Sequence, residues 1–445
     1  MKKLFLTLIF ISTVFTADDL FSIYNEALER DPEFNSKKAD LKISKEFRNQ
    51  SVSALLPRLN LSASTNWNEY YQERILQNDY NTFTYNLNFN QPLFRLDSWF
   101  TSRQAQKNYR AAEAQFAYQQ QNLMIRVTRA YFNVLSARSL FKTRGANERT
   151  LENQFEEIND KFEAGAASRI ELAEAKAALN RAISDRVLAE GNVDIAFEEL
   201  NAIVGREVKL ISPLKDDFKS VVDLEGVSDE VEKGIENNFL ISEAESRLEA
   251  AESKTRARTS NFLPKIDLNA NANRRTSKQY TFDGVDSDLD LPFFIPEETE
   301  NRSFSVQFSM PLFTSGLNSS QRRQAMLEEV RTEEQLLLIQ RNVTQRIRSL
   351  YTSLKTGQLN IESLEASYES SEDALEATRL GYELKARNLV DLLRAERNFF
   401  DAQNRLSQAK YDFIIRSLEF KQATGSLKPQ DLSLIHISEP TRRSV

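Results

Sequence analysis

The chain has 445 residues, with 58 lysines and arginines, 65 aspartates and glutamates, one histidine, 11 glycines, 10 prolines and no cysteine. The absence of cysteine excludes disulfides, cysteine-based metal sites and thiol nucleophiles. The net charge of −7 comes from interspersed charges of both signs, whereas a nucleic-acid-binding surface needs a basic stripe. Composition therefore argues against an enzyme, a bound cofactor or metal, and nucleic acid as a partner.

The first 17 residues predict an export signal. Lys2-Lys3 gives a positive start, an apolar run extends from Leu4 to Val14, and Thr16-Ala17 supplies small residues before a cleavage site. The bulky Phe15 leaves the cleavage site open by a residue or two, and an uncleaved membrane anchor is the alternative reading. No later apolar run approaches the 18 or so residues of a membrane helix. We therefore expect an exported protein that does not cross a bilayer as helices.

The rest of the chain consists of two copies of one sequence unit. Leu56-Pro57-Arg58 aligns with Leu263-Pro264-Lys265, and Gln91-Pro92-Leu93-Phe94 aligns with Met310-Pro311-Leu312-Phe313. Because an internal repeat determines the architecture of a chain, the domain boundaries are predicted from it. We expect a first repeat at 18–205, a linker at 206–234, a second repeat at 235–425 and a tail at 426–445.

Between its two proline marks, each copy alternates apolar and polar residues with a period of two. The predicted strands lie at about 57–68, 81–92, 264–274 and 302–311, and they begin or end at Pro57, Pro92, Pro264 and Pro311. The aromatic residues expected to face lipid are Trp67, Phe83, Tyr85, Phe89, Phe304 and Phe308. Strands of about ten residues with one apolar face suit a transmembrane barrel. A soluble antiparallel sheet with one wet face has the same pattern.

The number of strands favours the membrane barrel. A soluble sheet would need other segments to cover its apolar face, but the remaining chain is predicted to form long amphipathic helices. Four strands cannot close a barrel, since the smallest membrane barrels have about eight, and open edges are not tolerated in hydrocarbon. Several chains must therefore contribute strands to one barrel.

The hairpin tips at 68–79 and 276–300 are predicted to be loops in water. The second tip is longer and strongly acidic, with Asp283, Asp286, Asp288 and Asp290 among its residues. A calcium site is one interpretation of this run, although its spacing does not fit an EF-hand loop and a solvated charged loop is commoner.

A seven-residue repeat of apolar residues follows each pair of strands. In the second copy it passes through Leu354, Ile361, Tyr368, Leu375 and Tyr382. A heptad repeat predicts helices that supercoil around their neighbours. The pattern breaks at Gly165 and near Lys385, and then resumes until Gly205 and Gly425. Each copy should therefore hold a long helix, a turn and a returning helix.

The doubled Leu-Pro strand entries, the doubled Pro-Leu-Phe strand exits and the paired segments Ile170-Glu171-Leu172 and Val390-Asp391-Leu392 resemble the TolC-like outer-membrane efflux proteins. The resemblance covers roughly residues 20 to 432. It implies a homotrimer in the outer membrane of a Gram-negative bacterium, with a twelve-stranded barrel in lipid and an α-helical coiled-coil tunnel in the periplasm. It further implies a passive exit duct for efflux or type I secretion, which works with a periplasmic adaptor and a proton-driven or ATP-driven inner-membrane pump.

The resemblance also implies a narrow periplasmic aperture at the distal helical turns. The matching residues are Tyr382, Arg387 and Asp391 in the second copy and Glu171 in the first. Arg394 stands where the best-known relative has a second acidic ring, and it lies three residues after Asp391, within pairing distance on a helix. The turns at Gly165 and Lys385 are the expected adaptor-docking tips. A solvated helix end is the alternative interpretation of these charges.

The sequence allows an alternative for the function and another for the C-terminal tail. A structural or adhesive coiled-coil trimer anchored by a membrane barrel is the alternative function. The segment after Leu432, which contains His436, continues neither pattern and is expected to be non-native from about residue 433, with a disordered terminus as the alternative. The cargo cannot be read from the sequence, because the pump selects it.

Overall fold

The computed structural model describes residues 17–72, 75–213, 226–280 and 298–434. Almost all of the predicted export signal, the centre of the acidic second tip and His436 lie outside these residues. The helices and strands run in the following order: α1 (Leu20–Arg30), α2 (Pro32–Ser53), β1 (Arg58–Gln72), β2 (Ile75–Phe94), α3 (Leu96–Glu163), α4 (Arg169–Val204), α5 (Val227–Asn237), α6 (Phe239–Ser260), β3 (Lys265–Tyr280), β4 (Glu298–Ser309), α7 (Leu317–Glu383), α8 (Leu389–Ala423) and α9 (Pro429–Leu434).

The chain forms two compact units, and neither of them is one sequence repeat. The sheet unit comprises Asp40–Glu113 and Glu243–Leu337, and the helical unit comprises Met1–Ala39, Ala114–Ser242 and Leu338–Val445. Each unit therefore takes the corresponding part of both repeats. The duplication is expressed inside each unit rather than as two separate domains.

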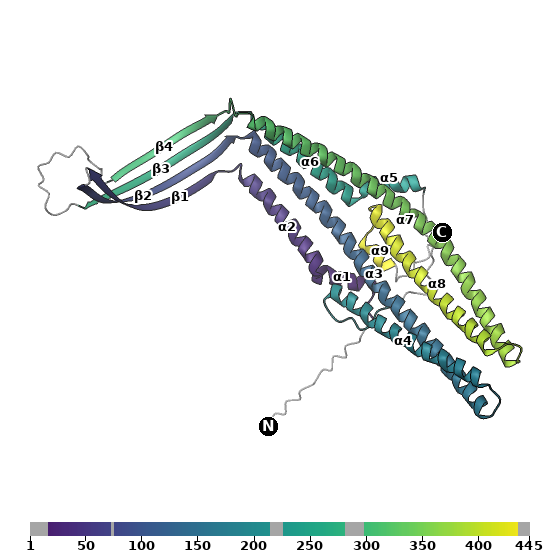
Figure 1. Cartoon of the computed structure of the whole chain (residues 1–445). Coiled ribbons are helices and arrows are strands. Elements are labelled where there is room, and N and C mark those ends of the chain that lie inside the picture. Colours follow the sequence, from purple (N-terminus) through teal and green to yellow (C-terminus); the bar gives the residue numbers. More distant parts are fainter. Residues whose placement is uncertain (1–16, 73–74, 214–225, 281–297, 435–445) are drawn as a thin grey trace, which may run out of the picture. The chain divides into compact units, whose positions relative to one another are not determined.

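The four predicted strands are confirmed as one antiparallel sheet in the order β1-β2-β3-β4 (Figure 1). The pairing of β2 with β3 joins the two repeats. Leu61 pairs with Leu87, which pairs with Ala272 on its other side. Because directly paired residues point to the same side of a sheet, the register collects the apolar residues on one face.

The six aromatic residues predicted to face lipid all lie on this apolar face. Most are strongly exposed in the single chain, and Phe83 and Tyr85 make an edge-to-face contact with ring centroids 4.7 Å apart. The opposite face consists mainly of amides and hydroxyls, with a few charged side chains such as Arg58 and Arg275. There the amide of Asn271 donates to the side-chain oxygens of both Asn86 and Asn88 at 2.5 Å. The sheet thus has one apolar face and one polar face.

The strands are longer than predicted, and the loops at their tips are correspondingly shorter. β1 continues to Gln72, β2 begins at Ile75, and β3 continues to Tyr280. The polar residues of the first tip keep pairing, as in Asn68 with Tyr80. Pro92 was expected to end its strand, but it lies inside β2, where the pairing with β3 shifts between Pro92 and Phe94. A proline, which lacks an N–H group, is tolerated at such an irregularity.

Two ion pairs connect the end of β2 and the start of α3 to strand β3. The Arg95 guanidinium donates to Asp267 at 3.0 and 2.6 Å, and the Lys265 ammonium donates to Asp97 at 2.6 Å. Asp97 lies in the first turn of α3, where a carboxylate also suits the positive end of the helix. These crossed pairs fix the junction between sheet and helix inside the sheet unit.

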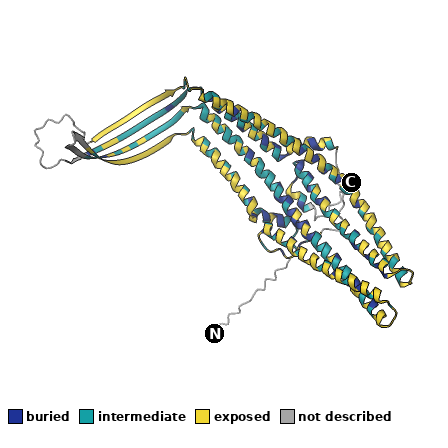
Figure 2. Cartoon of the chain, viewed as in Figure 1, coloured by how far each residue is buried: buried dark blue, intermediate teal, exposed yellow. Residues whose placement is uncertain are grey.

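The helical unit is held by a core in which α1, α3, α4, α8 and α9 meet, and its buried residues are the dark positions of those helices in Figure 2. Leu20, Tyr131, Leu200 and Leu432 are almost fully buried there. The predicted linker at 206–234 contains the start of α5, and the tail predicted from 426 begins with ordered packing, since Leu432 belongs to the core. No helix in the described ranges has the length and apolar character of a bilayer-spanning segment.

Helix α4 buries one alanine in every seven residues: Ala175, Ala182, Ala189 and Ala196. Leu354 and Ile361 of the predicted heptad on α7 are likewise buried. A small residue at each repeat lets helix backbones approach closely while the heptad keeps the seam on one side. The expected helix ends at Gly205 and Gly425 are confirmed, and both glycines have a φ of 73°.

Candidate functional site: the two distal turns

The turns α3–α4 and α7–α8 have the same backbone. Gly165 and Lys385 occupy equivalent positions with φ of 72° and 60°. In the first turn the N–H groups of Ala166 and Ala167 both donate to the carbonyl of Lys161, at 2.6 and 3.1 Å. In the second turn the N–H groups of Ala386 and Arg387 donate in the same way to Gly381, at 2.8 and 3.0 Å. The two repeats therefore share the same backbone hydrogen bonds in these turns.

Each returning helix begins with a side-chain cap. The Ser168 hydroxyl accepts from the N–H of Glu171 at 3.1 Å, and the Glu171 carboxylate accepts from the N–H of Ser168 at 2.7 Å, which together form a capping box. These hydrogen bonds hold the pKa of Glu171 below its ordinary value. In the second turn Asn388 caps α8 by accepting from the N–H of Asp391 at 2.9 Å. Both acidic residues are therefore fixed in the first turn of a helix, with their carboxylates near its positive end.

Asp391 pairs with Arg387 in this structure. The guanidinium and carboxylate of this pair lie 3.9 Å apart, one helical turn from each other. Among the described residues no ion pair joins Asp391 to Arg394, which is exposed. Two guanidinium groups therefore lie near Asp391 in the chain: Arg387 in the turn before α8 and Arg394 on α8 itself.

Tyr382 lies where the two helical hairpins touch. It packs against a small buried cluster of Ile158, Ala175 and Leu389, which belong to α3, α4 and α8. The Lys161 ammonium lies 5.6 Å from the centre of the Tyr382 ring, a cation–π distance. Partial burial raises the pKa of the Tyr382 hydroxyl. Of the predicted aperture residues, Tyr382 therefore makes the contact that joins one hairpin to the other.

Sequence reasoning missed Glu396, the most buried carboxylate of this region. Glu396 is 1% exposed. Its Oε1 accepts from the side-chain amide of Gln154 on α3 at 2.7 Å and lies 3.7 Å from the guanidinium of Arg379 on α7. Within the described chain its Oε2 has no hydrogen-bond partner. Burial raises the pKa of the Glu396 carboxyl.

A signal for Glu396 was present in the sequence. Leu389, Leu392, Glu396 and Phe400 are spaced three to four residues apart, so Glu396 interrupts the apolar stripe of α8. A carboxylate in such a stripe has to find polar partners on facing helices. Gln154 and Arg379 are those partners, from two different helices.

The tips also carry exposed aliphatic side chains. Ile170 and Leu384 are each 71% exposed, and they flank the turns at Gly165 and Lys385. An added Cβ at Gly165 would meet nothing within 4 Å, so the space beside this turn is open. The turns thus combine a fixed backbone with free apolar surface.

Comparisons with known proteins agree with this architecture. The model of the family described as "Outer membrane efflux protein" matches residues 23–206 and 231–426. The outer membrane protein TolC of Vibrio cholerae is 30% identical over 423 residues, covering 95% of this chain and 94% of that protein. The alkaline protease secretion protein AprF of Pseudomonas aeruginosa is 25% identical, covering 93% of this chain and 85% of that protein.

Solved structures show the same fold at lower identity. The crystal structure of CusC has a TM-score of 0.77 at 20% identity and covers 92% of both chains. The open-state structure of the MtrE outer membrane channel of Neisseria gonorrhoeae has a TM-score of 0.75 at 20% identity, covering 92% of this chain and 90% of that one. The family match extends over both repeats, and one relative reaches 30% identity over nearly the whole chain. The chain therefore belongs to the outer membrane efflux protein family.

Proposed function

We propose that the protein is the outer-membrane exit duct of an efflux or type I secretion system, and that it conducts substrates passively rather than transforming them. The observation that carries the proposal is the two-sided sheet. Its apolar face suits lipid, its amide face suits a water-filled lumen, and four strands are too few to close a barrel. The relatives named TolC and AprF support an export role, since AprF is a secretion protein for a protease.

The assembly we propose is a homotrimer, with a twelve-stranded barrel in the outer membrane and a helical tunnel that extends into the periplasm. In a closed ring each chain presents the same pair of complementary edges to its two neighbours. The apolar face, with Trp67, Phe83, Tyr85, Phe89, Phe304 and Phe308, would contact outer-membrane lipid. The energy for transport would come from an inner-membrane pump, reached through a periplasmic adaptor.

We propose that the distal turns form the periplasmic aperture. The Glu171 carboxylate accepts from the N–H of Ser168 at 2.7 Å, and the Asp391 carboxylate lies 3.9 Å from the Arg387 guanidinium, so both have a partner at a capped helix start. Rings of fixed acidic groups in a narrow pore raise the local concentration of cations. Arg387 and Arg394 oppose this effect, so the ring should be less selective for cations than carboxylates alone would make it.

The same turns are the proposed docking tips for the adaptor. The fixed backbone at Gly165 and Lys385, together with exposed Ile170 and Leu384, supplies a preformed apolar surface of the kind that protein partners bind. The proposed partner is therefore an adaptor whose own tip carries small or apolar side chains. Crosslinks confined to residues next to the sheet would contradict this docking site.

The aperture can be tested in planar bilayers with the purified protein. Asp391→Ala removes the only ion pair that joins Arg387 to α8 in the described structure, and Arg387→Ala removes its partner. Because an exposed pair contributes at most about 1 kcal/mol, we expect a rise in single-channel conductance of a few-fold rather than a fully open pore. Lys209→Ala, far along the chain from the turns, is the control. Unchanged conductance and ion preference in both variants would reject these residues as the aperture.

A further inference from the structure

The apolar face of the sheet continues onto one side of helix α3. Asp97, in the first turn of α3, binds Lys265 on the polar face of β3. Successive helix residues are about 100° apart around the axis, so Trp99 points to the side opposite Asp97. That side continues the apolar face, on which Phe94 pairs with Ile266. Trp99, which is 40% exposed, therefore extends the apolar face beyond the last residue of β2.

Arg103 lies one turn after Trp99 on the same side of α3, and we call these two residues the Trp99–Arg103 pair. The Arg103 guanidinium lies 4.3 Å from the centre of the Trp99 ring, and an edge-to-face contact with Phe100, with ring centroids 4.8 Å apart, holds Trp99 in place. Side chains on a helix lean toward its N-terminus, so the guanidinium lies nearer the sheet than the Arg103 backbone does. Stacking uses the face of the guanidinium and leaves the N–H groups at its edge free to donate.

Helices of the same chain cover both flanks of α3 but not this side. Arg48 of α2 stacks over Tyr109 on one flank, 5.0 Å from the ring centre, and Lys107 pairs with α6 on the other flank at 2.6 Å. The Trp99–Arg103 pair lies between these flanks, and both of its side chains are exposed. The pair is thus open to whatever surrounds the apolar face of the sheet.

This side of α3 carries positive charge that the chain does not neutralise. Between residues 96 and 110 the charged residues are Asp97, Arg103, Lys107 and Arg110. Asp97 and Lys107 have ion-pair partners, whereas among the described residues no ion pair or hydrogen bond engages the other two. The indole N–H of Trp99 likewise has no acceptor within the described chain. Two guanidinium groups and an indole N–H are therefore available to an anionic ligand.

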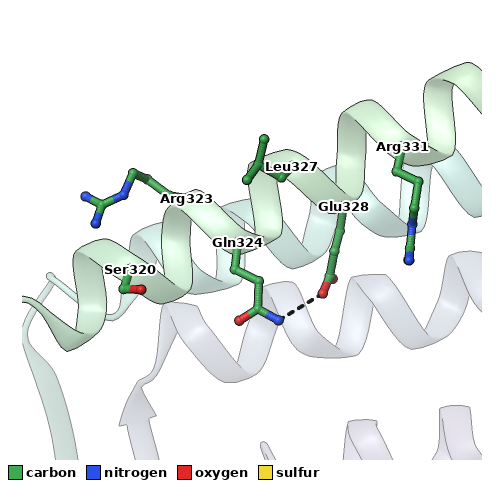
Figure 3. A pocket seen from close by; sticks show the side chains of 6 residues that line it. All are labelled: Ser320, Arg323, Gln324, Leu327, Glu328 and Arg331. Atoms are coloured by element: carbon green, nitrogen blue, oxygen red, sulfur yellow. Dashed lines mark hydrogen bonds between the residues drawn. The ribbon is translucent and has the colours of Figure 1, made fainter.

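The equivalent position of the second repeat has the cation but not the ring. Arg323 matches Arg103 with a difference of 220, and Ser319 stands where the first repeat has Trp99. In Figure 3 the Arg323 side chain points away from Glu328, which is the carboxylate among the residues drawn. Of these two equivalent positions, the one on α3 is therefore the one that combines a guanidinium with a ring.

We infer that the Trp99–Arg103 pair binds the phosphate group of an anionic phospholipid, such as phosphatidylglycerol, in the periplasmic leaflet of the outer membrane. The inference rests on the proposed function, which puts the apolar face in lipid. A guanidinium donates two N–H groups to one phosphate, and indole rings favour the boundary between hydrocarbon and water. An arginine that the chain does not neutralise favours a headgroup with a net negative charge over a zwitterionic one.

The depth of the pair suits a headgroup. A headgroup layer is about 5–8 Å thick on each side of the hydrocarbon. Helix α3 begins at Leu96, so Trp99 lies about 5 Å beyond the helix start. The Arg103 backbone lies about 10 Å beyond the start, but its side chain reaches back to the Trp99 ring. The ring and the guanidinium thus lie in the layer next to the hydrocarbon that would cover the sheet.

Trp99 can report the lipid beside it, because the chain has only two tryptophans, Trp67 and Trp99. The full-length Trp67→Phe variant is reconstituted in phosphatidylcholine vesicles that contain a nitroxide-labelled lipid, either phosphatidylglycerol or phosphatidylcholine, with the label near the headgroup end of the acyl chain. Quenching of Trp99 fluorescence against label content gives the relative affinity of the site for the two lipids. We expect phosphatidylglycerol to bind about five-fold more tightly, which corresponds to about 1 kcal/mol for one arginine near an anionic headgroup.

Two variants and a change of salt separate the stacked site from charge alone. Arg103→Ala in the same background should bring the relative affinity close to one. Arg110→Ala is the matched control and should keep the preference, since it removes an unpaired guanidinium from the same side of α3 about 10 Å further from the sheet. Sodium phosphate in place of sodium chloride at equal ionic strength should also keep the preference. A loss of the preference in phosphate would mean a site for the free ion and would overturn the lipid assignment.

Equal quenching of Trp99 by the two labelled lipids, or an equal loss of preference in Arg103→Ala and Arg110→Ala, would overturn the inference. If neither lipid quenches Trp99, the Trp99→Phe variant with a chain-labelled phosphatidylcholine shows what else fails. Quenching of Trp67 in that variant would leave the duct standing without the lipid site. Absence of quenching at Trp67 as well would overturn the proposed function together with the site.

Discussion

Glu396 shows how one buried carboxylate can link two helical hairpins. It lies on α8 and contacts Gln154 of α3 and Arg379 of α7, so its side chain connects three helices. Burial raises its pKa above the ordinary value, while in the unfolded chain the pKa returns to that value. Between the two values the folded protein binds more protons than the unfolded one, and the free energy of unfolding therefore falls as the pH rises.

We expect Glu396→Gln to remove this dependence. The amide keeps the shape and an acceptor for Gln154 but carries no charge to desolvate. The melting temperature of the variant should equal that of the wild type at low pH and exceed it by a few degrees at neutral pH, as measured by thermal unfolding from pH 4 to 8. Glu419→Gln is the matched control, because Glu419 accepts from Arg129 and Arg346 at 2.6 and 2.8 Å. The Glu419→Gln variant should be less stable than the wild type at neutral pH. If the melting temperatures of Glu396→Gln and the wild type differed by the same amount at every pH, the raised pKa of Glu396 would not explain the difference.

The two distal turns allow two residue types to be compared at one backbone conformation. They share one backbone, yet a glycine stands at the left-handed position of the first and a lysine at that of the second. A residue with a Cβ pays about 1–2 kcal/mol in this conformation, which glycine avoids. Because no atom would meet a Cβ at Gly165, the backbone term is the whole difference there.

Gly165→Ala should therefore destabilise its hairpin by about 1 kcal/mol, and Lys385→Gly should leave its own hairpin unchanged or more stable. Thermal unfolding of the two single variants measures this directly. The double variant, which exchanges the two residue types between turns, should have nearly additive effects, since the turns lie on different hairpins. A loss of stability in Lys385→Gly as large as in Gly165→Ala would mean that the lysine side chain, and not the backbone, holds the second turn.

The sequence predicted these elements well where they repeat a local pattern. Alternation located all four strands, and the heptads with Gly165, Gly205 and Gly425 located the long helices and their ends. The strand tips were missed because the alternation of polar and apolar residues breaks after Trp67, where Asn68 and Glu69 are both polar. Only the pairing with the facing strand shows that β1 and β2 continue through the tip. Pro92 was misplaced for a similar reason, because a shift in pairing with β3 accommodates it.

The candidate site was predictable only in its outline. The family resemblance suggested Glu171 and Asp391 as aperture residues, whereas Glu396 acquires its character from Gln154 and Arg379, which approach it from distant parts of the chain. The pairing of Asp391 with Arg387 rather than Arg394 likewise depends on how the turn places Arg387 beside the helix start. Side chains that come together through tertiary packing carry no local signal of their partners.

At the scale of the whole molecule, the polar face of the sheet decides what the proposed barrel can select. Its two central rows are Asn60, Asn88, Asn271 and Ser303, then Ser62, Asn86, Asn273 and Asn301. None of these side chains is ionisable. Lower on the same face, Asp267 is neutralised by Arg95 and Lys265 by Asp97. Arg58 and Arg275 also lie on this face, opposite Asn90 and Thr84 of β2. A lumen lined in this way offers hydrogen bonds to polar solutes, and its remaining charges do not favour cations.

Any preference for cations should therefore come from the helical tips. We expect the double variant Glu171→Gln with Asp391→Asn to have a ratio of cation to anion permeability of one or below, because Arg58 and Arg275 remain on the polar face of the sheet. The ratio is measured by reversal potential across a salt gradient in planar bilayers. Adding charge to the sheet should restore the preference: with Asn88→Asp in the same background, three carboxylates would enter the lumen of a trimer, where low-dielectric walls focus their field. Asn81→Asp, on the apolar face of β2, is the matched control and should not restore it. A strong cation preference that survives loss of the tip carboxylates would contradict their role as the source of that preference.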